Sequence, residues 1–551
     1  MSYLQRSSGP QNRTIVIYWI VLAFIWFFSL STRALIHSDE GRYASIAMEM
    51  LQSGDWITPR LNGILYFEKP ALQYWAGAAS FALFGFNEFA ARFWPGLTGF
   101  LTIVVVWLST KKLWGATVGH LAALAVAGSA WIIGNSHFLT LDMGTTFFLT
   151  LSLCSFILAQ DDATTPTHQR GLMWLCWAAM AGATLSKGLI GILIPGMTLI
   201  LYSLINWHWA PWRRMHWLSG LTLFFALTAP WFYLVAERNP GFNHFFFIHE
   251  HFERFLTTEH RRAGPIWYFV PYLILGFLPW TTLLGQVCRE GWKTTGESFR
   301  TRRFLLIWCV FIFAFFSKSG SKLPSYILPM FPALGILLAL VLEKIPSASL
   351  KKHLLLPILA WVLVLCAYPF VGRFASVHTP LPILQHLALY LVIAGVVFLV
   401  CAALAWRALK NNRKITAVML LVMATLLAVT LGGAGHDSYG QLKSSKWIVQ
   451  DIAPYLQADT QVFSVRTYDQ TFPYYLRRQV TLVDYVDEFE FGENAEPGRW
   501  IPTLADFVPH WNAAKSAVAM MDMTTYETLK QQNVPMKIIY QDVRRMVVAK
   551  P

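Results

Sequence analysis

Long runs of apolar residues, divided by short polar segments, fill most of residues 1–433. A helix needs about 17–25 consecutive apolar residues to cross a membrane. Runs of this length lie near 14–34, 93–110, 116–134, 138–160, 188–206, 215–236, 265–287, 325–343, 353–373, 384–406 and 415–433, with shorter candidates near 71–86, 170–185 and 303–317. The pattern therefore predicts a polytopic α-helical membrane protein.

The basic residues between these runs indicate which segments cross. Loops rich in Lys and Arg stay on the cytoplasmic side. The basic positions are Arg6, Arg13, Lys111-Lys112, Arg213-Arg214, Arg289 to Arg303, Lys351-Lys352 and Arg407 to Lys414. All of them face one side only if the segment 71–86 does not cross. We therefore expect about thirteen crossings, with residues 35–90 forming one external loop at the membrane interface.

After residue 433 the pattern changes to short runs that alternate or are rich in β-branched residues. The segments "TQVFSV", "QVTLVDYV", "SAVAMMDM", "MKIIYQDV" and "RMVVAK" are typical of strands. Helix-like runs at 441–456, 503–513 and 523–531 separate them. We therefore predict a transmembrane catalytic domain over residues 1–433 and an external α/β domain over residues 434–551.

Composition supports the membrane class, since 55% of the residues are hydrophobic and only 13% are charged. The formal net charge of +14 fits cytoplasmic loops and lipid headgroups better than a nucleic-acid partner. The six cysteines lie in or beside apolar runs, so we expect no disulfide framework. The first apolar run lacks a clear cleavage site, and we expect it to be a retained anchor.

An acidic pair, Asp39-Glu40, follows the first apolar run directly. The next residues, from Gly41 to Ser53, place apolar side chains on one helical face and Arg42 elsewhere, which predicts a helix lying flat at the interface. The acids then stand at its N-terminal end. They either serve only as capping and first-turn acids, which the helix dipole favours, or they carry chemistry.

Further ionisable residues are predicted on the same outer side, in addition to Asp39, Glu40 and Arg42. They are Tyr66, Glu68 and Lys69 of "YFEKPAL", Asp142 of "FLTLDMG", His249 and Arg254 of the loop 237–264, and Lys322 and Tyr326 of "KSGSKLPSYILP". Arg and Lys suit a phosphate, although each could instead only anchor lipid headgroups. A transporter would bury its charges near the bilayer midplane, whereas these lie at one edge. We therefore expect an anionic lipid substrate that is approached from outside.

Several motifs give the chain a family resemblance. The segments "DEGRYA", "GDWITPRLNGILYFEKPALQYW", "NEFAARFWP", "LTLDMGTTFF", "TLSKGLIG" and "KLPSYILP" resemble the bacterial lipid A 4-amino-4-deoxy-L-arabinose transferases. These are type C glycosyltransferases, related to the protein O-mannosyltransferases. The motifs cover roughly residues 1–340, and the rest matches only in layout.

The resemblance implies a multi-pass enzyme of the Gram-negative inner membrane, with its active site and C-terminal domain in the periplasm. Its donor would be undecaprenyl phosphate carrying aminoarabinose, its acceptor a phosphate of lipid A, and its outcome resistance to polymyxin-like peptides. Membrane lipids would be its other partners, and we expect a monomer. A different type C transferase, such as a protein O-mannosyltransferase, and a lipid transporter are the alternatives.

The resemblance also assigns roles to individual residues. It makes Asp39 the leading catalytic carboxylate, with Asp142 and Glu40 as further catalytic candidates. The substrate-binding candidates are Arg42, Tyr66, Lys69, Arg254, Lys322 and Tyr326, of which Lys69 and Arg254 would bind the lipid-linked phosphate. Glu68 and His249 are candidate ligands of a divalent ion, Zn or Mg, although they lack a diagnostic ligand spacing.

The chemistry of the acceptor bears on the role of Asp39. A hydroxyl acceptor needs a general base, but a phosphate monoester, with a second pKa of about 6, is already mostly anionic at neutral pH. We therefore hypothesise that Asp39 mainly positions a group, which could be the ammonium of the sugar, Arg42 or a bound metal.

Overall fold

The computed structural model describes residues 12–253, 264–294 and 296–551. The chain divides into two compact units, and each is described by itself. A helical unit comprises Met1–Leu30, Phe93–Tyr368 and Leu391–Gly432, and a mixed unit comprises Ser31–Arg92, Pro369–Tyr390 and Gly433–Pro551. The predicted domain boundary at residue 433 stays a prediction.

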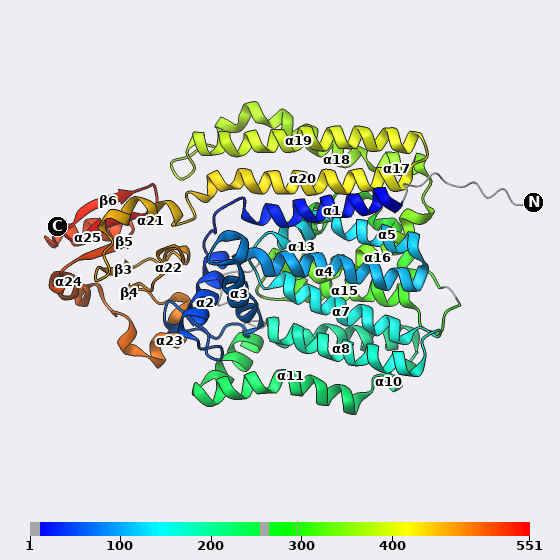
Figure 1. The fold of residues 1–551 in the computed structure, drawn as a ribbon, viewed down its shortest axis with the longest axis horizontal. Helices are drawn as coiled ribbons and strands as arrows, with labels where there is room; N and C mark the ends of the chain where they lie inside the picture. The colour runs from blue at the N-terminus through cyan, green and yellow to red at the C-terminus, as the bar shows by residue number, and fades with distance from the viewer. Residues whose placement is uncertain (1–11, 254–263, 295) are drawn as a thin grey trace, which may run out of the picture. The chain divides into compact units, whose positions relative to one another are not determined.

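Helices form the helical unit almost entirely (Figure 1). They are α1 (Asn12–Phe28), α4 (Glu88–Trp114), α5 (Ala116–Ala127), α6 (Ala130–Ser136), α7 (Asp142–Gln160), α8 (Pro166–Lys187), α9 (Ile190–Asn206), α10 (Ala210–Arg213), α11 (Trp217–Arg238), α13 (Phe269–Gly276), α14 (Leu284–Trp292), α15 (Thr301–Lys318), α16 (Phe331–Lys344), α17 (Ser347–His353), α18 (Leu355–Ala367), α19 (Leu381–Lys410) and α20 (Lys414–Gly440). The division between the units falls within α4, α19 and α20.

Membrane-length helices confirm the predicted class. Among the described residues, 8 helices are long and apolar enough to cross a membrane, or up to 10 if the two bent pairs, α5 with α6 and α13 with α14, each count as one span. Helix α9 is apolar but shorter, with 17 residues. Every predicted crossing is helical in the structure. By length and composition, however, fewer than thirteen helices of the described residues are able to cross a membrane, so the number of thirteen crossings stays a prediction.

The core of the helical unit surrounds α16. Every residue from Phe331 to Leu342 is buried, which agrees with a segment that is apolar on all sides. Helices α5 and α15 pack against it. At Gly335 an added Cβ would lie 2.5 Å from Val126 Cγ2, so the glycine permits the close approach of α16 to α5.

The mixed unit combines short helices with two sheets. Its elements are α2 (Asp39–Ser53), β1 (Arg60–Leu61), β2 (Ile64–Leu65), α3 (Leu72–Phe84), α21 (Lys446–Ile452), β3 (Gln461–Val465), α22 (Thr471–Leu476), β4 (Thr481–Val483), α23 (Glu490–Ala495), α24 (Leu504–Ala513), β5 (Ala517–Met521), α25 (Met523–Gln531), β6 (Lys537–Gln541) and β7 (Met546–Ala549).

All five predicted strands are present and form one sheet in the order β4-β3-β5-β7-β6. Strand β3 runs parallel to both β4 and β5, whereas β7 runs antiparallel to β5 and β6. Phe463, Phe507 and Trp511 are buried in the core of this sheet with α24. The predicted α/β character of residues 434–551 is therefore confirmed.

Helix α2 exists where it was predicted, but it does not have an exposed polar face. Its residues from Glu40 to Met50 are all buried, including Arg42 and Glu49. Within the mixed unit, α3, α22 and β1 pack around it. An added Cβ on Gly41 would lie 2.6 Å from the backbone of Gln470, so α22 and the residue before it cover the polar side. The sequence analysis could not include this distant segment, and the position of α2 at the membrane interface stays a prediction.

The structure also describes the short segment 71–86 and the surroundings of the six cysteines. Helix α3, which covers most of the segment 71–86, has 13 residues. At 1.5 Å per residue it is about 20 Å long, too short for a hydrocarbon core of about 30 Å. All six cysteines are free in the structure, and the expectation of no disulfide framework stays a prediction.

Candidate active site

The acids at the start of α2 have different environments. The side chain of Asp39 is 35% exposed, and its Oδ1 lies 2.9 Å from Nη1 of Arg42. Its Oδ2 has no hydrogen-bond partner among the described residues. Asp39 therefore keeps an accessible carboxylate oxygen while the other oxygen is fixed by a guanidinium.

Arg42 also contacts a second carboxylate, from the far end of the chain. Its Nε forms an ion pair with Oε2 of Glu488, whose side chain is buried. Gln470 donates a hydrogen bond of 2.7 Å to the other oxygen of Glu488. Burial raises the pKa of Glu488, and Arg42 opposes this effect. The single guanidinium of Arg42 thus forms ion pairs with two carboxyl groups, those of Asp39 and Glu488.

Glu40 is completely buried and held by two arginines. Arg92 donates from Nε to Oε1 at 2.8 Å and from Nη2 to Oε2 at 2.9 Å. Arg33 binds the same two oxygens at 2.8 and 2.7 Å. Burial alone would raise the pKa of Glu40, but Arg33 and Arg92 lower it to about 2. The carboxylate is therefore charged, fully paired and closed to substrate in this geometry.

The motif "YFEKP" follows the β1–β2 hairpin. Tyr66 is buried, and its hydroxyl has no hydrogen-bond partner among the described residues. Burial raises the pKa of Tyr66 well above its usual value, with Glu68 adding to the effect, so the hydroxyl stays a neutral donor. Lys69 donates to the carbonyl of Glu68 at 2.5 Å and lies 4.0 Å from its carboxylate.

In the helical unit, Asp142 is the first residue of α7, as predicted. Its Oδ1 forms an ion pair with Lys187 at the end of α8, and its Oδ2 accepts a hydrogen bond of 2.8 Å from Ser325. The ammonium of Lys187 also lies 4.5 Å from the centre of the Tyr326 ring. Asp142 and Tyr326 are thus brought together by a lysine to which the sequence analysis gave no role.

Three other candidates have less informative surroundings. Lys322 is buried and donates to the carbonyl of Ser319 at 2.6 Å. His249 belongs to the π-helical segment His244–Glu253 and stacks on Phe245, with the ring centres 5.3 Å apart. Arg254 lies outside the described residues. Their substrate-binding and metal-binding roles stay predictions.

No group of three His, Cys, Asp or Glu residues that could hold a metal ion occurs in the part of the chain that the structure describes. These residues therefore do not define a metal centre. A site built from Glu68 and His249 alone stays a prediction, and we derive no chemical step through it.

The sequence analysis gave no role to four charged residues that hold the candidates in place, namely Arg33, Arg92, Lys187 and Glu488. Arg92 and Lys187 lie within the resemblance motifs "NEFAARFWP" and "TLSKGLIG". Because these motifs carry the family resemblance, both residues could have been selected. Glu488 lies in the acidic run "DEFEFGENAE" and carries no such signal.

Comparison with known proteins places this geometry in a class. Residues 12–246 match the family model described as dolichyl-phosphate-mannose-protein mannosyltransferase, and residues 448–550 match the aminoarabinose transferase C-terminal domain. An oligosaccharyltransferase from Archaeoglobus fulgidus has a similar fold, with a TM-score of 0.54 and 12% identity over 93% of this chain and 69% of that one. The protein is a polytopic membrane glycosyltransferase with a type C fold.

The nearer relatives identify the family. The undecaprenyl phosphate-alpha-4-amino-4-deoxy-L-arabinose arabinosyl transferase of Edwardsiella ictaluri is 31% identical over 81% of this chain and 82% of its own length. The crystal structure of ArnT from Cupriavidus metallidurans bound to undecaprenyl phosphate is 36% identical, covers 98% of each chain and has a TM-score of 0.94. The chain belongs to this family of aminoarabinose transferases, which confirms the resemblance seen in its motifs.

Proposed function

We propose that this chain transfers 4-amino-4-deoxy-L-arabinose from undecaprenyl phosphate to a phosphate group of lipid A. The observation that carries the proposal is the likeness over 98% of the chain to a transferase whose structure contains undecaprenyl phosphate. In the mixed unit we assign the carboxylates at the start of α2 and the cation of Lys69 to this reaction. In the helical unit we assign the pair Asp142–Lys187 to it.

The donor step breaks the bond between C1 of the sugar and the phosphate oxygen of the lipid carrier. The electron pair of that bond goes to the leaving phosphate, while C1 gains oxocarbenium character. Lys69 supplies positive charge that stabilises the leaving phosphate, and the family resemblance implies the same role for Arg254. An oxygen of the acceptor phosphate forms the new bond to C1, in the single inverting displacement that the family resemblance implies.

Asp39 is suited to position groups in this reaction. An acceptor phosphate is already mostly ionised at neutral pH, so removing a proton from it adds little. Asp39 fixes Arg42 through one oxygen and has its second oxygen available. That oxygen can accept a hydrogen bond from the 4-ammonium group of the sugar, which also complements its charge.

Glu488 extends this part of the proposed site. Together Asp39 and Glu488 carry two negative charges against the one positive charge of Arg42. The remaining negative charge favours a cationic amino sugar over a neutral pentose. We assign Arg42 and Glu488 to the positioning of Asp39, and Tyr66 to donating a hydrogen bond to the donor.

Glu40 has a different proposed role from Asp39. Because it is buried and bound to Arg33 and Arg92, it acts as a positioning residue that fixes the first turn of α2. Removing its charge would shift Asp39 without removing any group that touches substrate. A divalent ion on Glu68 and His249 remains the cofactor proposal, to be tested by metal analysis of the purified wild type and of Glu68→Gln.

We place the enzyme in the inner membrane of a Gram-negative bacterium. The charge distribution along the chain supports an active site and a C-terminal α/β region on the periplasmic side. We propose that the enzyme acts as a monomer.

A reaction in detergent tests the proposal. Purified full-length protein is incubated with undecaprenyl phosphate-aminoarabinose and lipid A, and the lipid A is analysed by mass spectrometry. We expect the mass of one or more aminopentose groups to be added. Unmodified lipid A, together with transfer of another sugar or to a peptide acceptor, would contradict it in favour of another type C transferase.

A further inference from the structure

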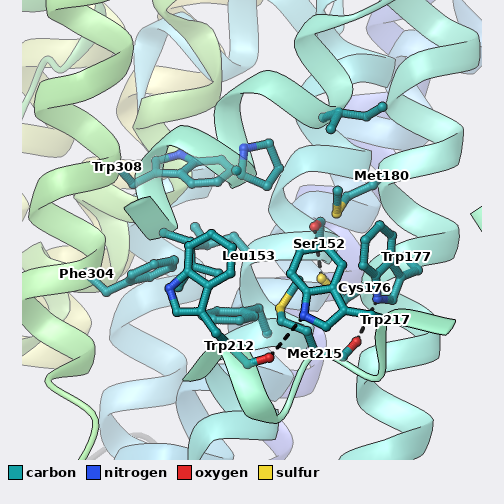
Figure 2. Close-up of a pocket in the computed structure, with 15 residues that line it drawn as sticks. Ser152, Leu153, Cys176, Trp177, Met180, Trp212, Met215, Trp217, Phe304 and Trp308 are labelled. Carbon is teal, nitrogen blue, oxygen red and sulfur yellow. Dashed lines mark hydrogen bonds between the residues drawn. The ribbon is translucent and has the colours of Figure 1, made fainter. Parts of the chain in front are cut away.

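An apolar cavity of about 90 Å³ lies in the helical unit, away from the residues assigned above. Helices α7, α8, α9 and α15 contribute to it, together with the connector between α9 and α11. Figure 2 shows the rings of Trp177, Trp212, Trp217, Phe304 and Trp308 among the side chains that surround it. Hydrocarbon and aromatic side chains therefore form its walls.

The polar atoms in these walls are already paired. Trp177 donates to the carbonyl of Met215 at 2.9 Å, and Trp217 donates to the carbonyl of Trp212 at 3.1 Å. Ser152 Oγ and Cys176 Sγ bind each other at 3.3 Å, as Figure 2 shows. A water molecule needs two to four polar partners to be held in a cavity. This cavity therefore suits hydrocarbon rather than water.

The rim of the cavity contains apolar side chains that other residues do not cover. Ile192 is 37% exposed and Trp217 is 42% exposed, and both line the cavity. The neighbouring Leu193 is exposed as well. On a membrane-spanning helix such as α9, an exposed Ile or Leu faces the acyl chains of lipids. A chain from the bilayer can therefore enter the cavity from the side.

The connector marks the depth of the cavity in the membrane. Its sequence, "WHWAPWRRMHW" over residues 207–217, contains four tryptophans and two arginines. The rings of Trp212 and Trp217 stack with their centres 5.8 Å apart. Tryptophans gather at the headgroup level of a bilayer. The end of the cavity lined by Trp212 and Trp217 therefore lies next to the lipid headgroups of the leaflet that the sequence predicts to be cytoplasmic.

The two arginines of the connector provide a binding group for an anion. Arg213 is exposed and has no hydrogen-bond or ion-pair partner within the described ranges. Arg214 is exposed, donates to the carbonyl of Gln160 at 3.1 Å and lies 3.9 Å from a carboxylate oxygen of Asp162. Neither guanidinium is fully used, so each can donate hydrogen bonds to a phosphate diester.

We propose that this site binds an anionic glycerophospholipid of the surrounding membrane, with its phosphate on Arg213 and Arg214 and part of one acyl chain in the cavity. The cavity of about 90 Å³ is smaller than an apolar cavity of about 150 Å³ that holds one benzene molecule, so it takes only a few methylene groups. The rest of the chain lies along Ile192 and Leu193. The bound lipid would contact α8, α9 and the connector and so hold these three segments together, and this role would not depend on the transfer reaction.

Photocrosslinking tests the site with the full-length protein. The protein is placed in nanodiscs that contain phosphatidylglycerol with a diazirine on one acyl chain, and in matched discs with the phosphatidylcholine analogue. After illumination the labelled peptides are identified by mass spectrometry. We expect phosphatidylglycerol to label residues 190–217 more strongly than phosphatidylcholine does.

Two variants separate the cavity from the headgroup site. Gly196 lines the cavity, and a Cβ there meets no atom within 4 Å, so Gly196→Leu adds a bulky side chain at the cavity wall whose first carbon does not clash. Gly285→Leu, at an exposed glycine of α14 with equally open surroundings, is its control. Arg213→Gln should lower phosphatidylglycerol labelling about fivefold, the effect of one surface cation on an anionic lipid. Lys352→Gln, an exposed cation of α17, is the matched control.

The outcomes distinguish the proposal from general lipid contact. Labelling of 190–217 that is lost in Gly196→Leu but kept in Gly285→Leu supports the cavity. Equal labelling in these two variants, or labels located elsewhere in the wild type, would overturn it. Equal labelling by the two lipids would overturn the role of Arg213 and Arg214. Because the Arg213→Gln change is on the surface, this variant remains informative even if Gly196→Leu fails to fold.

Discussion

The guanidinium of Arg92 binds both carboxylate oxygens of Glu40, at 2.8 and 2.9 Å, although the two residues are 52 positions apart. Arg92 also donates to the backbone carbonyls of Arg33 and Ala34, at 2.7 and 2.8 Å. One arginine thus joins the segment before α2, the first turn of α2 and the beginning of α4. The residue next to Asp39 is fixed by this network.

Glu40→Gln should destabilise the protein and reduce turnover. The substitution removes the carboxylate that both buried arginines bind, and removing one partner of a buried ion pair costs about 3–5 kcal/mol. Thermal unfolding of the detergent-purified protein measures this loss. Asp451→Asn, at an exposed acid of α21, should leave the melting temperature unchanged. A Glu40→Gln protein as stable as the wild type would show that the network is not structural.

Asp39→Asn should reduce turnover about 100- to 1000-fold, the usual effect of losing one electrostatic contact in a transition state. It should leave the binding of undecaprenyl phosphate nearly unchanged, because the proposed contacts of Asp39 are with Arg42 and the sugar. Initial rates and a lipid titration of the same preparation measure both. Loss of rate and binding together would instead indicate a structural role for Asp39.

Lys69→Ala should weaken the binding of undecaprenyl phosphate. A hydrogen bond to a charged group contributes about 1.5–3 kcal/mol, which corresponds to about 10- to 100-fold in affinity. The melting temperature is followed as the lipid is added, with Lys515→Ala, at an exposed lysine, as the control. If the lipid stabilises Lys69→Ala as much as the wild type, Lys69 does not bind the phosphate.

The pH dependence of stability should change in Glu493→Gln. Both carboxylate oxygens of Glu493 are buried without a hydrogen-bond partner among the described residues, and burial raises its pKa to about 7. Because the folded-state pKa is above the usual value of 4.5, stability is highest below about pH 4.5 and falls as pH rises through 7. The unpaired group costs about 1–3 kcal/mol, so the variant should be more stable than the wild type at pH 8.

Thermal unfolding at pH 5 and pH 8 measures this difference. At pH 5 the wild type and Glu493→Gln should melt at nearly the same temperature, because the carboxyl group is then mostly neutral. Glu527→Gln, at an exposed acid of α25, should follow the wild type at both values. A constant difference between Glu493→Gln and the wild type across this range would contradict the shifted pKa.

Local patterns in the sequence predicted much of the fold. The helical run behind Asp39, the position of Asp142 in the first turn of α7 and the five strands of the C-terminal sheet are all present. Each of these depends on residues that are close together in the chain. Hydrophobic periodicity reports such short-range relationships well.

Contacts between distant residues could not be read in this way. Arg42 pairs with Glu488, which lies in an acidic run that looks like a solvated surface segment. The polar side of α2 appeared to need water or headgroups, but Gln470 and α22 cover it. Neither pairing leaves a periodic signal in one sequence, so the partners of the candidate residues became visible only in the structure.

A double-mutant experiment should separate the two roles that Asp142 can have. Its ion pair with Lys187 is largely buried, so Asp142→Asn and Lys187→Met should each lower the melting temperature by leaving one charge unpaired. The double variant should recover much of that stability, because neither charge is left behind. If Asp142 also takes part in transfer, the double variant stays inactive despite its recovered stability. Ser325→Ala removes only the hydrogen bond from a neutral hydroxyl to the Asp142 carboxylate and should cost about 1.5–3 kcal/mol. Recovery of both stability and turnover in the double variant would show that the pair serves only to hold α7 against α8.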